Sequence, residues 1–208
     1  MKLPTIPASA VLAISLVFAV TQAAATQYPI GSGTVTINGS SEALPAGGTF
    51  GDSSYDAGTG YLSPGKFAFP QATVANGDFT ITYQLAQSDT SAALVGSNGN
   101  VGFTTASMQL SIVSASYLGF PVSVSPCRFS PIAWGTLGGS ASATGMHISN
   151  GIFTVPPTTD SCGGYQAQIN DALAGNQNSI TMVIDGNFTP PALDDRVYMD
   201  GFDTQPSP

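Results

Sequence analysis

The residues that could carry chemistry are few, and they are concentrated in one stretch of the chain. Residues 127–162 contain both cysteines, the single tryptophan and the single histidine: Cys127, Cys162, Trp134 and His147. Thiolates and imidazoles serve as nucleophiles, bases and metal ligands, and paired cysteines form disulfides. The spacing of these residues decides between those uses.

The two cysteines favour a structural disulfide. Cys127 and Cys162 lack the close spacing of zinc-binding pairs, and the two glycines after Cys162 do not make a redox motif. An export signal at the start of the chain, described below, implies an oxidising compartment. Closing a loop of about 35 residues restricts the unfolded chain by roughly 3–4 kcal/mol. We therefore expect one stabilising bridge.

A serine hydrolase is disfavoured because its nucleophile would lack a partner. Residues 51–53, Gly-Asp-Ser, are similar to the nucleophile segment of Gly-Asp-Ser hydrolases. Such enzymes need a later histidine that is preceded three residues earlier by aspartate. The histidine here is His147, and Thr144 stands three residues before it. Residues 51–53 also recur in part as residues 138–140, Gly-Gly-Ser, which favours a turn.

Carboxylate and metal chemistry have equally little support. A glycosidase needs two acids at a set separation, yet Glu42 is the sole glutamate and the aspartates fall mostly in turns. One histidine and a bridged cysteine pair do not supply a zinc site. Calcium could use oxygen atoms near Asp52 and Asp56, but no segment matches an EF-hand loop. We predict no catalytic residue, no metal site and no cofactor.

Three aromatic residues are candidates for a ligand surface: Trp134, Tyr55 and Tyr61. An aromatic ring can cover the apolar face of a sugar as it covers core side chains. A lone tryptophan between two cysteines, however, more often packs against the disulfide in the core of a sandwich fold. The core interpretation is therefore favoured for Trp134.

Residues 1–25 have the features of a secretory signal peptide. Lys2 supplies the positive start, residues 10–20 form an apolar core, and residues 23–25 are the small residues that a signal peptidase needs. The apolar run is too short to span a bilayer permanently, and no later stretch approaches a transmembrane helix. We expect cleavage before Thr26 and a protein that is secreted, periplasmic or at the cell surface.

The charge balance after residue 25 limits the partners. Lys66, Arg128 and Arg196 are the basic residues there, against twelve acidic ones. Charged residues make up 8% of the chain, where an ordinary domain has about 25%. So few cations argue against nucleic acid or an anionic membrane as a partner. We expect an envelope component or a carbohydrate instead.

Period-two alternation predicts a β-rich domain over residues 26–188. Residues 34–37 open it and turn at Asn38-Gly39, which is a hairpin signal. Further alternating segments lie at 79–85, 108–112 and 180–184, and 120–124 leads toward the first cysteine. We expect one buried and one solvated face for such strands.

One helix is expected after the second cysteine, ending near Gly175. The apolar residues at helical spacing there are Tyr165, Ile169, Ala172 and Leu173. The disulfide would pin this helix over an open end of the β core. The predicted fold class is all-β: a two-layer antiparallel sandwich or flattened barrel with one short helix and one disulfide.

The chain changes character beyond residue 188, where residues 189–208 form a Pro-rich connector and an acidic tail. The Thr-Pro-Pro sequence of residues 189–191 predicts a stiff connector. Residues 195–203, Asp-Arg-Val-Tyr-Met-Asp-Gly-Phe-Asp, resemble the short tail ending in Asp-Gly-Phe-Glu on many exported proteins of Gram-negative bacteria. Asp203 stands where that tail usually has glutamate. The resemblance implies export.

The domain itself pairs Cys127-Arg128 with a Phe-x-apolar-Pro segment at residues 153–156 and with Cys162-Gly163. In this it resembles uncharacterised secreted bacterial β-rich proteins, a group to which we attach no activity. We predict a non-enzymatic exported protein of the cell envelope or extracellular space that acts by surface binding or structure. Two alternatives stay open: a secreted hydrolase of polysaccharide or ester, and a pilin-like subunit.

Overall fold

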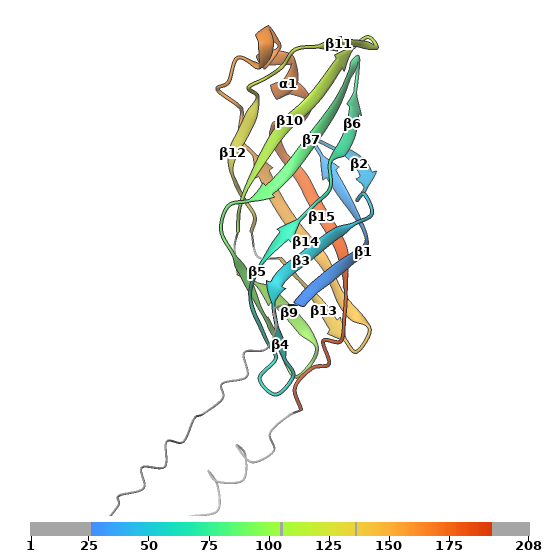
Figure 1. The fold of residues 1–208 in the computed structure, drawn as a ribbon, viewed down its shortest axis with the longest axis vertical. Coiled ribbons are helices and arrows are strands. Elements are labelled where there is room, and N and C mark those ends of the chain that lie inside the picture. Colours follow the sequence, from blue (N-terminus) through green and yellow to red (C-terminus); the bar gives the residue numbers. More distant parts are fainter. Residues whose placement is uncertain (1–25, 105, 136, 193–208) are drawn as a thin grey trace, which may run out of the picture.

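The computed structural model of the protein describes residues 26–104, 106–135 and 137–192. The predicted signal peptide and the acidic tail beyond residue 192 lie outside these residues. The described chain forms an elongated, mostly antiparallel β structure with a helix, α1, at one end (Figure 1). The all-β prediction is therefore confirmed.

Eight strands close a barrel. In order around it they are β5 (Tyr61–Ala68), β3 (Gly48–Ser53), β1 (Thr26–Ile37), β15 (Gly175–Asp185), β14 (Gly145–Val155), β13 (Gly138–Ser142), β9 (Asn100–Phe103) and β8 (Ser91–Val95). β8 then pairs with β5 and completes the circle. Closure leaves none of these eight strands as a free edge along its whole length, which removes the surface that open sheets must protect.

The remaining strands lie outside this barrel. They are β2 (Ser40–Ala43), β4 (Tyr55–Asp56), β6 (Ala72–Asn76), β7 (Phe79–Gln87), β10 (Ser107–Tyr117), β11 (Phe120–Val122) and β12 (Arg128–Ala133). β7 joins β5 on one side and β10 on the other, and β10 pairs with both β11 and β12. β7, β10, β11 and β12 extend the structure toward the end that carries α1, whereas β4 lies at the opposite end (Figure 1).

The sheet branches along β5, which pairs with β7 at one end and with β8 over the rest of its length. β5 and β7 share one ladder pair, Ala68 with Ala86. The side chain of Gln87 takes over beyond it: its Oε1 accepts a hydrogen bond from the Phe67 N–H (2.7 Å), and its Nε2 donates to Ser91 Oγ (3.0 Å). Gln87 and Ser91 are both buried. Because their polar groups are paired, the branch can lie in the core.

Period-two burial holds along the strands predicted from alternation. Every second residue of each strand faces the core: Phe79, Ile81, Tyr83 and Leu85 in β7, Met108, Leu110 and Ile112 in β10, and Ile180, Met182 and Ile184 in β15. Burial of such a side chain contributes about 1.5–3 kcal/mol. Asn38 and Gly39 form the predicted turn between β1 and β2.

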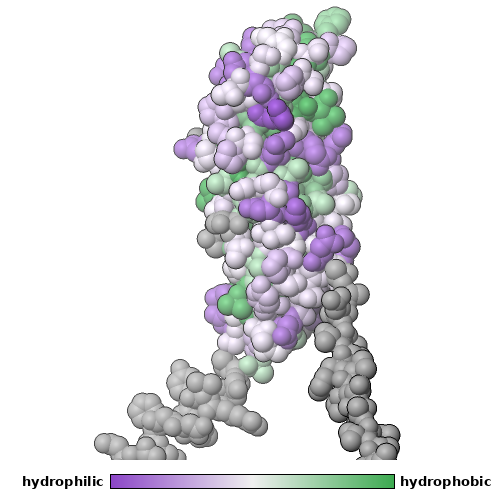
Figure 2. Space-filling view, turned by 60° about the vertical axis from the view of Figure 1, so that its left-hand side comes forward, coloured by the Kyte–Doolittle hydropathy of each residue, from purple (hydrophilic) through white to green (hydrophobic). Residues whose placement is uncertain are grey.

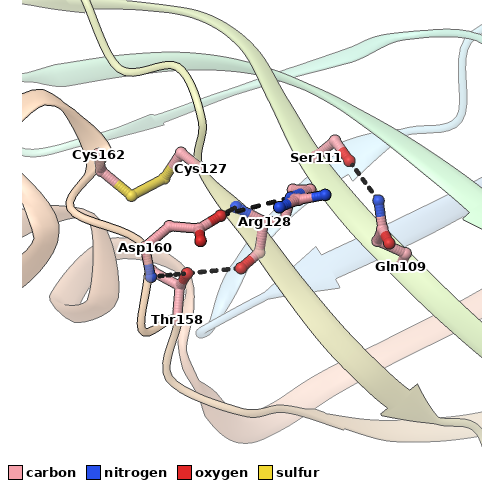
Figure 3. A network of polar contacts seen from close by, with 7 residues as sticks. All are labelled: Gln109, Ser111, Cys127, Arg128, Thr158, Asp160 and Cys162. Carbon is pink, nitrogen blue, oxygen red and sulfur yellow. Dashed lines mark hydrogen bonds and ion pairs between the residues drawn. A yellow bond between two sulfur atoms is a disulfide. The ribbon is translucent and has the colours of Figure 1, made fainter.

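The 3-10 turn η1 (Cys162–Gly164) and helix α1 (Gln166–Leu173) cover one end of the structure. The buried side of the helix is the predicted one, Ile169, Ala172 and Leu173. Cys127 and Cys162 form the predicted disulfide just before the helix (Figure 3). Gly163 follows with a φ of +64°, and a Cβ there would lie 1.7 Å from the carbonyl oxygen of Ser123. Only glycine fits this close approach.

Both ends of the described chain lie opposite to α1. Thr26 pairs with Ser53 at the beginning of β1. At the other terminus, Phe188 is buried against the ring of Tyr55 (centroids 5.5 Å apart), and the Tyr55 hydroxyl donates a hydrogen bond to the Thr189 carbonyl oxygen (2.7 Å). Figure 1 shows β4, which contains Tyr55, at the lower end and α1 at the upper end. We call the upper end the distal end.

Candidate functional site

Trp134 lies in the core and not on a ligand surface. Its side chain is 1% exposed. Its ring packs against Phe67, Phe69 and Phe153, with centroids 5.9 Å away in each case. The indole N–H has no hydrogen-bond partner among the described residues. A sugar cannot reach this ring, so Trp134 drops out of the predicted ligand surface.

Tyr55 and Tyr61 lie on neighbouring strands, far from the distal end. Tyr55 is half-buried, and this burial, with a smaller contribution from the Asp56 carboxylate, raises the pKa of Tyr55. Tyr61 is 44% exposed and pairs across β5 and β8 with Leu94, which is 59% exposed. These two side chains form an apolar strip on the barrel wall. Tyr55 contacts Phe188 and Thr189 and offers less surface to a ligand.

The Gly-Asp-Ser segment has a structural explanation. Ser53 is buried, and its hydroxyl donates a hydrogen bond to the Ser63 carbonyl oxygen (2.6 Å). Asp52 has a φ of +61° at an irregularity in the pairing of β3 with β1. A β-bulge accounts for both features. Ser53 is therefore not placed as a nucleophile.

His147 lies on the outer wall of the barrel, beside a shallow groove of about 420 Å³. The other polar side chains of the groove carry hydroxyl groups: Ser32, Thr34, Ser149 and Thr181. No described residue makes a hydrogen bond to the imidazole, and no carboxylate lines the groove. A catalytic histidine is normally oriented by such a partner.

Among the acidic side chains on the described surface, Asp56 has a local structural role. Asp56 accepts hydrogen bonds from the Gly58 N–H (2.8 Å) and the Thr59 hydroxyl (2.9 Å). These bonds, led by the one from Gly58, lower the pKa of Asp56. No three His, Cys, Asp or Glu side chains gather as a metal site among residues 26–104, 106–135 and 137–192.

Within the part of the chain that the structure describes, no helix is long and apolar enough to cross a bilayer.

A second depression, of about 260 Å³, lies at the distal end. Three elements form it: the turn between β6 and β7, the end of β10, and α1. The residues that line it are Asn76, Asp78, Phe79, Tyr117, Gln168, Asp171 and Ala172. The Asn76 side-chain amide donates to the Ala172 carbonyl oxygen (3.2 Å) and ties the turn to the helix. We call this the acidic depression, after Asp78 and Asp171.

Aromatic rings form one wall of the acidic depression. The ring of Phe79 lies 4.9 Å from that of Tyr117 and 5.7 Å from that of Tyr165, centroid to centroid. The two tyrosine rings are 6.3 Å apart. Tyr117 is exposed, whereas Phe79 is buried. An exposed ring beside carboxylates and amides is the kind of surface that binds polar ligands with an apolar or cationic face.

The hairpin between β10 and β11 projects beside this depression. Tyr117 pairs with Phe120, and Leu118 and Gly119 form a two-residue turn. Leu118 is 60% exposed and Phe120 is 74% exposed. In Figure 2, apolar side chains reach the surface near the upper end of the molecule. We call residues 117–120 the hairpin tip.

Neither the acidic depression nor the hairpin tip was predicted from the sequence. Residues 120–124 were expected to lead as a strand into Cys127, but β11 ends at Val122 and Phe120 faces solvent. A Leu-Gly pair between Tyr117 and Phe120 is the available turn signal. The depression has no local signal, because Asp78 and Asp171 come from distant parts of the chain.

Comparison of the chain with protein-family models, with curated proteins and with solved structures found no match.

Proposed function

We propose that the protein is a non-enzymatic exported protein that binds an envelope or extracellular partner through its distal end. One observation carries the proposal: the first and last described residues lie at one end of an elongated molecule, and the exposed binding groups lie at the other. Thr26 and Thr189 lie at one end, and the acidic depression and hairpin tip lie at the other. A protein held by either terminus presents the distal end to its surroundings.

The chemistry of the distal end suits binding. Large apolar groups that face water mark interaction sites when they are grouped. Leu118 and Phe120 stand together at the hairpin tip, next to the exposed ring of Tyr117. Asp78 and Gln168 add hydrogen-bonding groups on open surface. Binding needs only these contacts, whereas catalysis needs a paired and oriented group.

The hydrolase alternative is supported by one specific observation. Asp78 and Asp171 line the same depression, and glycosidases act with two carboxyl groups on either side of the bond that they cleave. The pilin-like alternative gains no support, because pilin subunits accept a strand from a neighbour and the barrel here is already closed by pairing within the chain.

Co-sedimentation with bacterial envelope fractions and insoluble polysaccharides tests the proposal. We expect wild-type protein to bind at least one of these materials, and Tyr117→Ala to weaken that binding at least about tenfold. Tyr61→Ala is the matched control, because Tyr61 is exposed near the opposite end. Binding lost in Tyr61→Ala and kept in Tyr117→Ala would refute the distal site.

A substrate panel separates binding from hydrolysis. Turnover of a polysaccharide that disappears in both Asp78→Asn and Asp171→Asn would replace the binding proposal with the glycosidase alternative. Circular dichroism and melting temperature show whether each variant keeps the fold.

A further inference from the structure

The turn at the hairpin tip holds an unexpected residue. Leu118 and Gly119 have φ values of +50° and +82°. The turn between β1 and β2 has the same pattern, with +47° at Asn38 and +86° at Gly39. Two-residue hairpin turns with positive φ favour Asn-Gly or Asp-Gly, because other side chains clash with the backbone there. Leu118 therefore occupies a position where asparagine is the easier choice.

Leu118 is unfavourable for a second reason, since it exposes its apolar side chain to water. Phe120, beside it in the hairpin, is exposed even more. A strained backbone conformation and exposed apolar groups at one place indicate a contact made in function.

The hairpin tip can enter an apolar medium without burying a charge. Residues 90–127 contain no Asp, Glu, Lys, Arg or His. Backbone groups at the tip are paired as well: β10 and β11 form a ladder up to Tyr117 and Phe120, and the Leu118 N–H donates to the Asp78 carbonyl oxygen (2.8 Å). Unpaired backbone groups are the main barrier to entering lipid, and here that barrier is small.

The charges of the acidic depression determine which lipid headgroups the distal end can bind. Asp78 and Asp171 stand on exposed surface next to Tyr117, so anionic headgroups are repelled and ammonium groups are attracted. An aromatic ring also attracts a quaternary ammonium through its face.

We propose that the hairpin tip inserts among the headgroups of a bilayer made of zwitterionic lipids, with the ammonium groups next to Asp78 and Asp171. Leu118 and Phe120 supply the apolar contact, and the carboxylates keep the insertion shallow. This inference rests on the proposed role of the distal end and names its partner. The elongated barrel then stands away from the bilayer, with Thr26 and Thr189 at its far end.

Vesicle flotation tests the inference, using protein purified after export, with its N-terminus established by mass spectrometry. Residues 1–25 are apolar and would bind vesicles themselves if they were retained. We expect binding to phosphatidylcholine vesicles and weaker binding when phosphatidylglycerol is added. Leu118→Asn should reduce binding at least about tenfold, because it replaces the apolar isopropyl group of one inserted side chain by a polar amide. Leu94→Asn is the matched control, since Leu94 is equally exposed on the barrel wall.

Leu118→Asn also distinguishes a loss of membrane contact from a loss of folding. Asparagine suits the positive φ of position 118, so Leu118→Asn should keep or raise the melting temperature while it loses vesicle binding. Phe120→Trp provides a direct signal: its indole should shift to shorter emission wavelengths with vesicles, whereas Trp134 is already buried.

Several results would overturn the inference. The first is that wild-type protein does not bind vesicles. The second is that Leu118→Asn and Leu94→Asn lose vesicle binding equally. The third is that the protein binds anionic vesicles more tightly than phosphatidylcholine vesicles. A dimer that Leu118→Asn dissociates in analytical ultracentrifugation, without vesicle binding, would assign the tip to self-association instead. Loss of polysaccharide binding in Tyr117→Ala, without vesicle binding, would keep the distal site and make carbohydrate its partner.

Discussion

The backbone N–H of Arg128 donates a hydrogen bond to Oδ2 of Asp160 at 2.9 Å, and the Arg128 side-chain Nε lies 3.5 Å from the same oxygen (Figure 3). Thr158 completes the link, because its hydroxyl donates to the Arg128 carbonyl oxygen (2.5 Å) and accepts from the Asp160 N–H (3.1 Å). The loop before α1 is thus fastened to β12 next to the disulfide.

We expect the backbone hydrogen bond, and not the ion pair, to stabilise this link. Asp160→Ala should lower the free energy of unfolding by about 1–2 kcal/mol, because the Arg128 N–H loses a charged acceptor. Arg128→Ala should cost less than about 1 kcal/mol, since its side chain is 58% exposed. Urea unfolding measures both. An equal cost for the two variants would show that the ion pair carries the stability.

The disulfide should contribute more than this network does. Cys127→Ser combined with Cys162→Ser opens a loop with a sequence separation of 35 residues. The double variant should lose roughly 3–4 kcal/mol in urea unfolding under non-reducing conditions. Hydrogen exchange should also rise first in α1, because the bridge lies just before it. The control is wild-type protein with reductant, and an unchanged unfolding midpoint would contradict the expectation.

The strands, the helix and the disulfide could be predicted from the sequence because each depends on a local pattern of side chains or on a single residue pair. Strands such as residues 79–85 and 180–184 have period-two burial, and α1 follows the spacing of Ile169 and Leu173. Each of these depends on side chains within one segment. The chain has two cysteines, so only one disulfide pairing within it is possible.

Features that join distant segments could not be predicted in the same way. Pairing of β5 with both β7 and β8 depends on the buried amide of Gln87, which nothing near it in the sequence indicates. Phe120 begins the segment that was expected to lead toward Cys127, yet the hairpin turns it out to solvent. Asp78 and Asp171 line one depression because the disulfide and Asn76 place α1 beside the turn between β6 and β7. The candidate site is therefore a product of tertiary structure.

Stability should fall in alkaline solution because of one buried tyrosine. Burial, with a smaller contribution from the Glu42 carboxylate, raises the pKa of Tyr83 to about 12. The folded state therefore keeps this proton when the unfolded chain, with its pKa near 10, releases it. The stabilisation is complete below about pH 10 and is lost as the pH rises toward 12, with a total of about 2–3 kcal/mol.

Urea unfolding between pH 8 and 12 measures this dependence for wild type and Tyr83→Phe. The variant should show a shallower decline above pH 10, because phenylalanine does not titrate. Parallel curves for the two proteins would exclude Tyr83 as the source.

His147→Ala should leave the function of the protein largely intact. Histidine titrates near neutrality and is the most common general base, so it is the first residue to test for catalysis. Here its imidazole has no hydrogen bond from a described residue, and its groove holds hydroxyl groups without a carboxylate. On β14 it pairs with Val183 of β15 and Ser140 of β13, as an outward-facing strand residue.

The measurement is a panel of ester and polysaccharide substrates together with the binding assays, run on wild type and His147→Ala. We expect equal binding, with a change of less than about 0.5 kcal/mol in unfolding free energy, because surface substitutions away from networks have small effects. Clear turnover by wild type that vanishes in His147→Ala would show the protein to be an enzyme. It would also move the site from the distal end to the barrel wall. Turnover that survives in His147→Ala would point to the carboxylates of Asp78 and Asp171, the two acids that share one depression.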